Sequence, residues 1–296
     1  MKVAYDQQTF TYQSYGGISR YYTKLSGELL KQNQNVGVFA GMHRNNYIED
    51  LPEDVVRGYK LVKYPPKTQR IFQLINHGFC QAQMKLWQPD IIHETYYSAL
   101  PVLNTNAMRV ATVYDMIHEL YRHQFSNSDK TTQWKKKTFS RVDHIISISD
   151  STKKDLVELM GIPEDKVSVV HLGVDVSVFS AEKFQLNPSD KPYLLYVGSR
   201  AGYKNFSGLI KAFGSSPQLK TNLDVIAFGG GPFNSSEHSL IKQLGIDTKN
   251  VRQVSGDDNK LSQLYANATA FVFPSMYEGF GLPPLEAMAA GCPVVS

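Results

Sequence analysis

The sequence predicts an α/β protein built from two doubly wound domains, and a repeated pattern supports this. Residues 3–5 form a short apolar run that leads through Gly16 and Gly17 into apolar residues at helical spacing, 18–30. Residues 193–198 open a second unit of the same kind, followed by a helical pattern over 206–213. A strand, a glycine turn and a helix in this order are typical of Rossmann-like domains.

The expected domain boundary lies between these two units. A chain of 296 residues favours about two domains. Residues 176–191 lose apolar periodicity and are rich in proline and polar residues towards their end, so we place the linker there. The predicted domains are residues 1–184 and 185–296.

Further apolar runs and helical patterns alternate along both halves, as a parallel sheet with covering helices requires. The additional strands are expected at 36–40, 90–94, 109–114, 144–149, 223–228, 251–254 and 270–273. The additional helices are expected at 67–87, 129–141, 239–244 and 260–266. In such sheets ligands bind beyond the carboxyl ends of the strands, so polar residues at these ends are the candidates for a site.

Composition narrows the class of protein. Hydrophobic residues make up 42% and charged residues 20%, which is ordinary for a soluble domain, and a net charge of +4 is too weak to indicate nucleic acid binding. Cys80 and Cys292 are too few for a disulfide scaffold and are expected as thiols. The start resembles a strand rather than a signal peptide, and no apolar run approaches about 18 residues, so a cytoplasmic protein is expected.

A basic cluster precedes the helix expected at 67–87. It contains Lys60, Lys63, Lys67 and Arg70. A solvated surface explains it, and contact with an anionic lipid-linked acceptor or with membrane headgroups is the alternative.

The most informative stretch is residues 273–291, which has the pattern of a strand, a glycine turn and a helix. Gly279 and Gly281 allow a tight backbone and close approach of a ligand. Pro283 and Pro284 suit a first helical turn. The turn therefore directs backbone N–H groups and the positive end of a helix dipole towards an anion, and a phosphate-type site is expected.

Two carboxylates frame this turn, Glu278 before it and Glu286 in the expected first helical turn. One glutamate there is often only a partner of the helix dipole. Two glutamates around one glycine turn favour a functional role. Together they resemble the E-x7-E signature of the retaining, family-4 type glycosyltransferases, which have the GT-B fold of two Rossmann-like domains facing a cleft.

This resemblance covers nearly the whole chain and implies a nucleotide-sugar donor and a saccharide or lipid-linked acceptor. It implies that Arg200 and Lys204 stabilise the leaving diphosphate, that Glu278 contacts the donor sugar and that Glu286 binds the ribose. Other residues implied in substrate binding are Gly16, Gly17, Gly230, Gly279, Phe280, Gly281 and Leu282. It further implies retention of configuration, a mannose-like hexose and a role in polysaccharide biosynthesis.

Candidates for the acceptor side lie at strand ends of the first domain. Asp115 and His118 follow the strand expected at 109–114. His93 and Glu94 end the strand expected at 90–94, and Tyr96 lies just beyond it. Similar proteins have a His-Asp pair at the first of these positions. Here Tyr114 replaces the histidine, which leaves Asp115 and His118 to hold acceptor or sugar hydroxyls.

The end of the sequence and its lack of metal-binding motifs add two further expectations. It stops at Ser296, whereas similar proteins continue through further α/β units, so the second domain is expected to be incomplete. No Asp-x-Asp pair and no His/Cys cluster with metal spacing occurs, so neither a metal nor a cofactor is expected. A truncated nucleotide-sugar-binding protein and a sugar-nucleotide epimerase stay open as alternatives, and a nicotinamide-dependent dehydrogenase lacks its glycine fingerprint.

Overall fold

The computed structural model describes residues 1–100, 102, 105–179, 191–200 and 202–296. The chain divides into two compact units. Unit 1 comprises Met1–Leu120 and Phe125–Val170, and unit 2 comprises Tyr121–Gln124 and His171–Ser296. The predicted boundary between residues 184 and 185 lies outside the described residues and stays a prediction.

Unit 1 contains a parallel sheet with the strand order β3-β2-β1-β4-β5-β6-β7. Its strands are β1 (Lys2–Tyr5), β2 (Asn35–His43), β3 (Val56–Lys60), β4 (Ile91–Glu94), β5 (Met108–Val113), β6 (His144–Ser147) and β7 (Val167–Val169). Its helices are α1 (Gln8–Tyr12), α2 (Gly17–Lys31), α3 (Gln69–Trp87), α4 (Ile117–Leu120), α5 (Thr131–Arg141) and α6 (Asp150–Met160).

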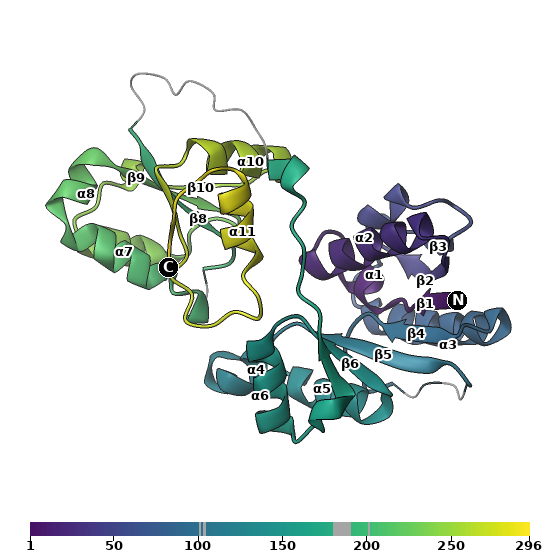
Figure 1. The fold of residues 1–296 in the computed structure, drawn as a ribbon. Helices are drawn as coiled ribbons and strands as arrows, with labels where there is room; N and C mark the ends of the chain where they lie inside the picture. Colours follow the sequence, from purple (N-terminus) through teal and green to yellow (C-terminus); the bar gives the residue numbers. More distant parts are fainter. Residues whose placement is uncertain (101, 103–104, 180–190, 201) are drawn as a thin grey trace. The chain divides into compact units, whose positions relative to one another are not determined.

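The first strand shows how the sheet of unit 1 is covered on both faces. Successive side chains of a strand point to opposite faces. Val3 and Tyr5 of β1 pack in a core with residues of α2, whereas Ala4 packs with Cys80 and Met84 of α3. Helices α2 and α3 therefore cover opposite faces, as Figure 1 shows.

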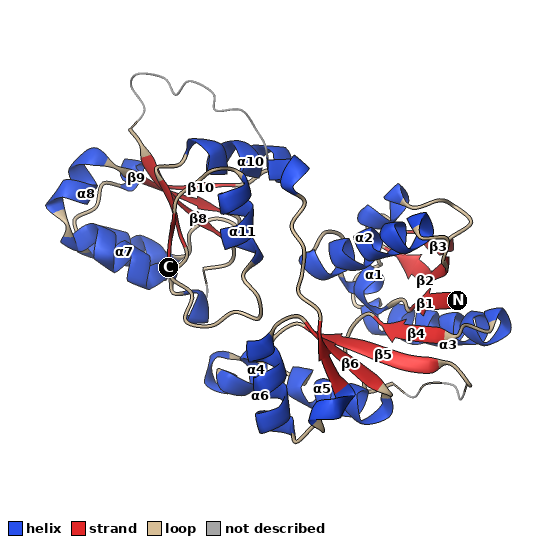
Figure 2. Ribbon diagram, in the orientation of Figure 1, coloured by secondary structure: helices blue, strands red, loops and turns tan. Residues whose placement is uncertain are grey.

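Unit 2 repeats this architecture around a smaller parallel sheet with the strand order β10-β9-β8-β11-β12. Its strands are β8 (Tyr193–Val197), β9 (Asp224–Phe228), β10 (Val251–Val254), β11 (Ala270–Val272) and β12 (Val294–Val295). Its helices are α7 (Phe206–Ser215), α8 (Pro217–Asn222), α9 (Ser235–Gln243), α10 (Asp258–Asn267) and α11 (Leu282–Ala289). Figure 2 shows helices on both sides of this sheet.

The predicted fold class is confirmed, since each unit is a doubly wound parallel α/β unit. Part of the predicted linker was wrong, because residues 176–179 form a short 3-10 turn whose Phe179 is buried in the core of unit 2 beside Tyr265. In helix α5, Lys135 is 1% exposed, because Asp115 and Glu119 bind its ammonium. Within the described residues, no helix is long and apolar enough to cross a bilayer.

Candidate functional site

The candidate site of unit 2 lies at the carboxyl edge of its sheet. Strands β9, β8 and β11 are adjacent, so the turns that follow them meet at one edge. These turns carry Gly229–Gly231, Arg200 with Lys204, and Glu278, in that strand order. The candidate residues of unit 2 were predicted from the sequence to lie in these three turns. The strand order of the sheet brings the three turns close together.

An ion pair joins two of the predicted catalytic residues. Lys204, at the end of the 3-10 turn Gly202–Lys204, contacts Glu278 with its Nζ 2.6 Å from Oε1. The two side chains are 20% and 18% exposed, so the pair is accessible to a ligand although largely enclosed. The hydroxyl of Tyr196 supports the turn by donating to the backbone oxygen of Ser199 at 2.6 Å.

Arg200 lies in the same turn but is committed to protein groups. Its Nε donates to Glu237 Oε1 at 2.7 Å, and its side chain is 4% exposed. Its Nη1 donates to the backbone oxygen of Gly229, and its Nη2 donates to those of Gly231 and Pro232, each at 2.9 Å. Every nitrogen of the guanidinium thus has a protein acceptor, and Arg200 fastens the glycine loop to α9.

The glycine loop needs its glycines for two reasons. Gly229, Gly230 and Gly231 have φ values of +85°, +68° and +71°, a region that side chains with a Cβ rarely adopt. A Cβ on Gly230 would lie 2.6 Å from Nη1 of Arg200 and 3.1 Å from the backbone oxygen of Gly198. Any side chain at Gly230 would therefore clash with the guanidinium of Arg200.

The glycine turn before α11 presents the expected helix N-terminus. Gly281 precedes the helix with φ +93°, and no side chain caps it. Of the groups that lack an intrahelical partner, Gly281 and Leu282 have an N–H, whereas Pro283 and Pro284 have none. Two backbone donors thus face the site, fewer than a typical helix start offers.

Glu286 does not lie in the first turn of α11, so that part of the prediction was wrong. The helix begins at Leu282, which leaves Glu286 in its second turn. The buried hydroxyl of Tyr265 donates to Glu286 Oε2 at 3.3 Å. Burial, and then the neighbouring Glu286 carboxylate, raise the pKa of Tyr265, so this hydroxyl stays a donor.

Two other predicted residues lie in the turn before α11. Gly279 is buried, and the ring of Phe280 packs near the ring of His171, with 5.7 Å between their centroids.

Asp115 and His118, the predicted acceptor-side pair in unit 1, each have partners of their own. Lys135 donates to the backbone oxygen of Asp115 at 2.7 Å and lies 3.4 Å from its Oδ1. The ring of His118 stacks on Phe125 at 4.1 Å, and its Nε2 lies 3.7 Å from Asp129 Oδ2. Both side chains remain partly exposed, at 29% and 22%.

The glycines Gly16 and Gly17 start α2, as predicted. The side chain of Gln13 takes the place of a cap, because its Oε1 accepts the N–H of Ser19 at 3.1 Å. A Cβ on Gly16 would meet this glutamine side chain, whereas one on Gly17 would meet open space. The sequence did not indicate Gln13, because its contact depends on how the loop folds back.

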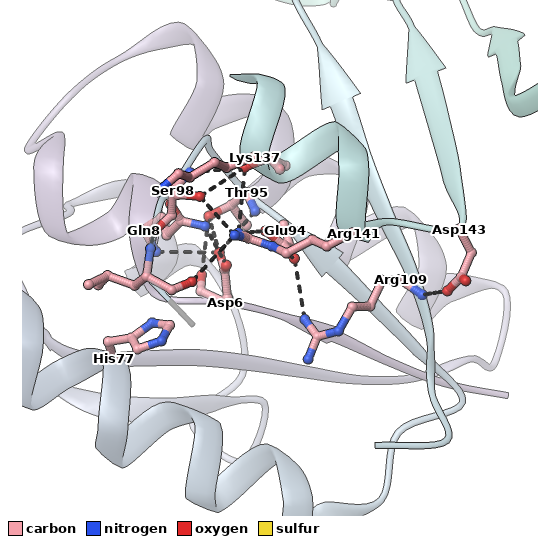
Figure 3. A network of polar contacts seen from close by, with 12 residues as sticks. Asp6, Gln8, His77, Glu94, Thr95, Ser98, Arg109, Lys137, Arg141 and Asp143 are labelled. Carbon is pink, nitrogen blue, oxygen red and sulfur yellow. Dashed lines mark hydrogen bonds and ion pairs between the residues drawn. The ribbon is translucent and has the colours of Figure 1, made fainter. Parts of the chain in front are cut away.

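His93 and Glu94, predicted near the acceptor, belong to the interior of unit 1. His93 packs against the rings of Tyr5 and Tyr22, and burial lowers its pKa to about 3. Glu94 is 2% exposed and binds Arg141 and Arg109, as Figure 3 shows. These interactions make both residues structural.

A hollow of about 360 Å³ opens beside the candidate site in unit 2, between the starts of α7 and α9. Arg200, Phe206, Asn234 and Glu237 line it together with other residues of the two helices. Glu237 was missed by sequence reasoning, although the spacing Asn234-x-x-Glu237 is that of a capping box, which the structure contains.

Comparison with protein families gives matches over nearly the whole chain. Residues 15–178 match the family described as Glycosyltransferase Family 4, and residues 178–296 match Glycosyl transferases group 1. The first match alone covers more than half of the chain.

Curated relatives and solved structures agree with these matches. The chain is 26% identical over 258 residues to O-antigen chain mannosyltransferase RfbU of Salmonella typhimurium, covering 84% of this chain and 69% of that protein. It is 28% identical over 204 residues to O-antigen chain mannosyltransferase B of Escherichia coli, covering 63% of this chain and 52% of that protein. The structure of HepE from Anabaena, in complex with UDP and glucose, superposes with a TM-score of 0.69 at 17% identity, covering 100% of this chain and 80% of that one.

Proposed function

Because this chain belongs to the family-4, group 1 glycosyltransferases, we propose that it moves a hexose from a nucleoside diphosphate sugar to a saccharide or lipid-linked acceptor. The observation that supports the proposal most is the Lys204–Glu278 pair beside a glycine turn and a helix N-terminus. The two mannosyltransferase relatives favour mannose as the sugar, and the neighbour solved with UDP and glucose favours a nucleotide-linked donor.

The leaving diphosphate is proposed to bind between a cation and backbone donors. Lys204 supplies the point charge, and the N–H groups of Gly281 and Leu282 supply hydrogen bonds at the positive end of α11. Preorganised donors of this kind stabilise charge that develops on a leaving group. A metal ion is not needed for this neutralisation, so we propose metal-independent transfer.

Binding of the donor changes the partner of Glu278. The structure pairs Lys204 with Glu278, with 2.6 Å between Nζ and Oε1. A diphosphate that attracts Lys204 releases the Glu278 carboxylate, which then accepts hydrogen bonds from the sugar hydroxyls. Glu286, held by Tyr265, takes the ribose hydroxyls.

Arg200 contributes by positioning rather than by contact in this scheme. Its contacts to Glu237 and to the loop carbonyls hold the glycine loop in its left-handed conformation. The loop backbone, including Gly230, lies beside the turn that carries Lys204. The prediction that Arg200 itself touches the diphosphate stays a prediction.

Transfer is proposed to proceed with retention of configuration. The bond between the anomeric carbon and the diphosphate oxygen breaks, and the electron pair leaves with the diphosphate. The acceptor hydroxyl attacks from the same face and gives its proton to the departing phosphate oxygen. No protein nucleophile is required, and Glu278 favours positive charge at the anomeric carbon.

We propose that unit 1 binds the acceptor. Asp115 and His118 are partly exposed and offer a carboxylate and an imidazole to acceptor hydroxyls, and the Gly16–Gly17 turn lets a sugar approach the start of α2. We propose a cytoplasmic enzyme of polysaccharide biosynthesis that meets its acceptor at the inner face of the membrane.

A thermal-shift screen against UDP-, GDP- and other nucleotide hexoses, followed by product analysis, tests this proposal. We expect one nucleotide series to raise the melting temperature, and a new glycoside to form with the matching acceptor. An isomerised nucleotide sugar would indicate an epimerase instead. Stabilisation without turnover would indicate a binding protein.

A further inference from the structure

One short segment of the chain belongs to a different unit from its neighbours in sequence. Tyr121–Gln124 is part of unit 2, whereas the residues on both sides of it, up to Leu120 and from Phe125, are part of unit 1. The segment consists of Tyr121 and the 3-10 turn Arg122–Gln124, and it is here called the clasp. Its contacts within unit 2 therefore join residues that are distant in sequence.

Gln124 fastens the backbone of the turn that carries Lys204. Its Oε1 accepts the N–H of Tyr203 at 2.9 Å, although the two residues are 79 positions apart. A Cβ on Gly202 would lie 2.0 Å from this oxygen, so the turn approaches the glutamine closely only because position 202 is a glycine. Since Lys204 follows directly, Gln124 restrains the backbone from which the lysine side chain extends.

Tyr203 is held from the side of Glu278 as well. Its backbone oxygen accepts the N–H of Met276 at 2.8 Å, two residues before Glu278. Hydrogen bonds therefore run from Gln124 through Tyr203 to Met276. They join the two turns that carry the partners of the Lys204–Glu278 ion pair.

The ring of Tyr121 adds contacts to both of these turns. Its centroid lies 6.0 Å from that of Tyr203 and 6.3 Å from that of Tyr277. Tyr203 precedes Lys204, whose Nζ lies 5.4 Å from the centroid of this ring. Tyr277 precedes Glu278. Aromatic rings at these distances attract each other, so the clasp packs against both residues that directly precede the ion pair.

We propose that the clasp, through Gln124 and Tyr121, sets the position of the Lys204 ammonium for transfer. The inference rests on the proposed function, because it concerns how Lys204 meets the leaving diphosphate. Electrostatic stabilisation of a leaving group depends on charges that are already in place, and a displacement of about 1 Å can cost about 100-fold in rate. Gln124 and Tyr121 are positioning residues in this scheme, since they act through Lys204 without contact to the substrate.

A contribution to folding alone does not account for the clasp. Gln124 is exposed, and an exposed hydrogen bond adds little to stability because water competes for both partners. Lys204, in contrast, carries its charge on a flexible stem, which keeps one position only where its backbone and its surroundings are fixed. The main effect of the clasp is therefore expected in the rate of transfer.

Steady-state kinetics of the 296-residue chain test the proposal with Gln124→Met, which keeps the length of the side chain and removes the acceptor oxygen. We expect kcat to fall at least about tenfold while KM for the donor changes less than about threefold, because the charge contact matters most in the transition state. Gln124→Glu keeps an acceptor oxygen and should recover most of kcat at high salt, which screens its added charge. Gln218→Met, at an exposed position of α8, is the matched control and should behave like the unaltered chain.

A double-mutant cycle separates positioning from a general loss of structure. In the Lys204→Ala background, Gln124→Met should reduce kcat no further, because Gln124 acts through Lys204. Tyr121→Ala should follow the same pattern, and Tyr121→Phe, which keeps the ring, should retain kcat. The inference would be overturned by an unchanged kcat in Gln124→Met, by a full additional loss in the Lys204→Ala background, or by an equal loss in Gln218→Met.

Binding of free nucleoside diphosphate gives a second measurement that does not need turnover. This product carries the charge that develops during transfer, so Gln124→Met should weaken its binding about tenfold, and the Tyr203 amide should exchange its hydrogen faster. If the unaltered chain binds a nucleoside diphosphate but forms no glycoside, the transferase proposal fails. Unchanged diphosphate binding in Gln124→Met would contradict the role of the clasp separately.

Discussion

Replacing Lys204 by alanine should slow transfer while leaving the fold of unit 2 largely intact. The change removes the ammonium that lies 2.6 Å from Glu278 Oε1. It creates no large cavity, because the side chain is already one-fifth exposed. The two consequences, for stability and for turnover, differ in size and can be measured separately.

The stability cost follows from the partial exposure of the pair. Exposed ion pairs contribute about 0–1 kcal/mol, whereas breaking a buried pair costs about 3–5 kcal/mol. With both side chains about one-fifth exposed, water still reaches Glu278 after Lys204 is removed. We therefore expect a loss of about 1–2 kcal/mol in the free energy of unfolding.

The catalytic cost should be larger, because the leaving diphosphate loses its preorganised cation. Such a loss costs at least about 2 kcal/mol of transition-state stabilisation, which is roughly a 30-fold fall in kcat/KM. The assay is release of nucleoside diphosphate with the donor that gives the largest thermal shift. Lys204→Arg should recover part of the rate, since it restores the charge but not its position.

Lys153→Ala is the matched control for this experiment. Lys153 is 24% exposed and lies 3.4 Å from Glu164 Oε1 in unit 1, away from the candidate site. It should lose little stability and no turnover. Unchanged turnover in Lys204→Ala would refute the diphosphate role, and equal losses in the two variants would reduce it to a general charge effect.

Three further outcomes are expected. Arg200→Ala should cost about 3 kcal/mol of folding stability in denaturant unfolding, because Glu237 (13% exposed) and the loop carbonyls lose their donor. Gly230→Ala should cost about 1–3 kcal/mol by the same measure and weaken nucleotide-induced stabilisation, since φ is +68° and a Cβ would meet Arg200. His93 has its pKa lowered to about 3, so between pH 6.5 and 3 the unfolded chain binds a proton there that the folded chain does not. Stability should therefore fall with acid, and His93→Asn should remove up to about 1.4 kcal/mol per pH unit from this slope.

The fold could be predicted largely because apolar runs mark buried parallel strands. Residues 193–198 and 270–273 were expected as strands, and β8 and β11 lie there with bounds one residue shorter. Helix α1 was missed, because its buried residues are mostly polar and lack helical spacing of apolar side chains. The carboxylate of Asp6, which precedes α1, accepts hydrogen bonds from Gln8 and from Thr95. Thr95 lies 89 residues away, so its contact leaves no local signal in the sequence.

The candidate site could be predicted in its residue types but not in its pairing. Glycine turns at strand ends indicated an anion site, and the sheet order does place these turns at one edge. Lys204 and Glu278, however, are 74 residues apart, and no sequence pattern indicates that they contact each other. Asp115 was expected to be available to an acceptor. No sequence pattern indicates its contact with the buried Lys135 either.

The turn that carries Arg200 and Lys204 shows that residue type alone does not predict the role of a side chain. Both cations occupy one turn, and their residue types alone assign both to the same anion. The 3-10 turn Gly202–Lys204 separates them, so that one side chain is 4% exposed against Glu237 and the other is 20% exposed beside Glu278. Arg200 already donates to several backbone oxygens and to the Glu237 carboxylate, and it must break these hydrogen bonds to reach a phosphate. Lys204 would exchange only its contact with Glu278. The difference predicts that stability depends chiefly on Arg200 and turnover chiefly on Lys204.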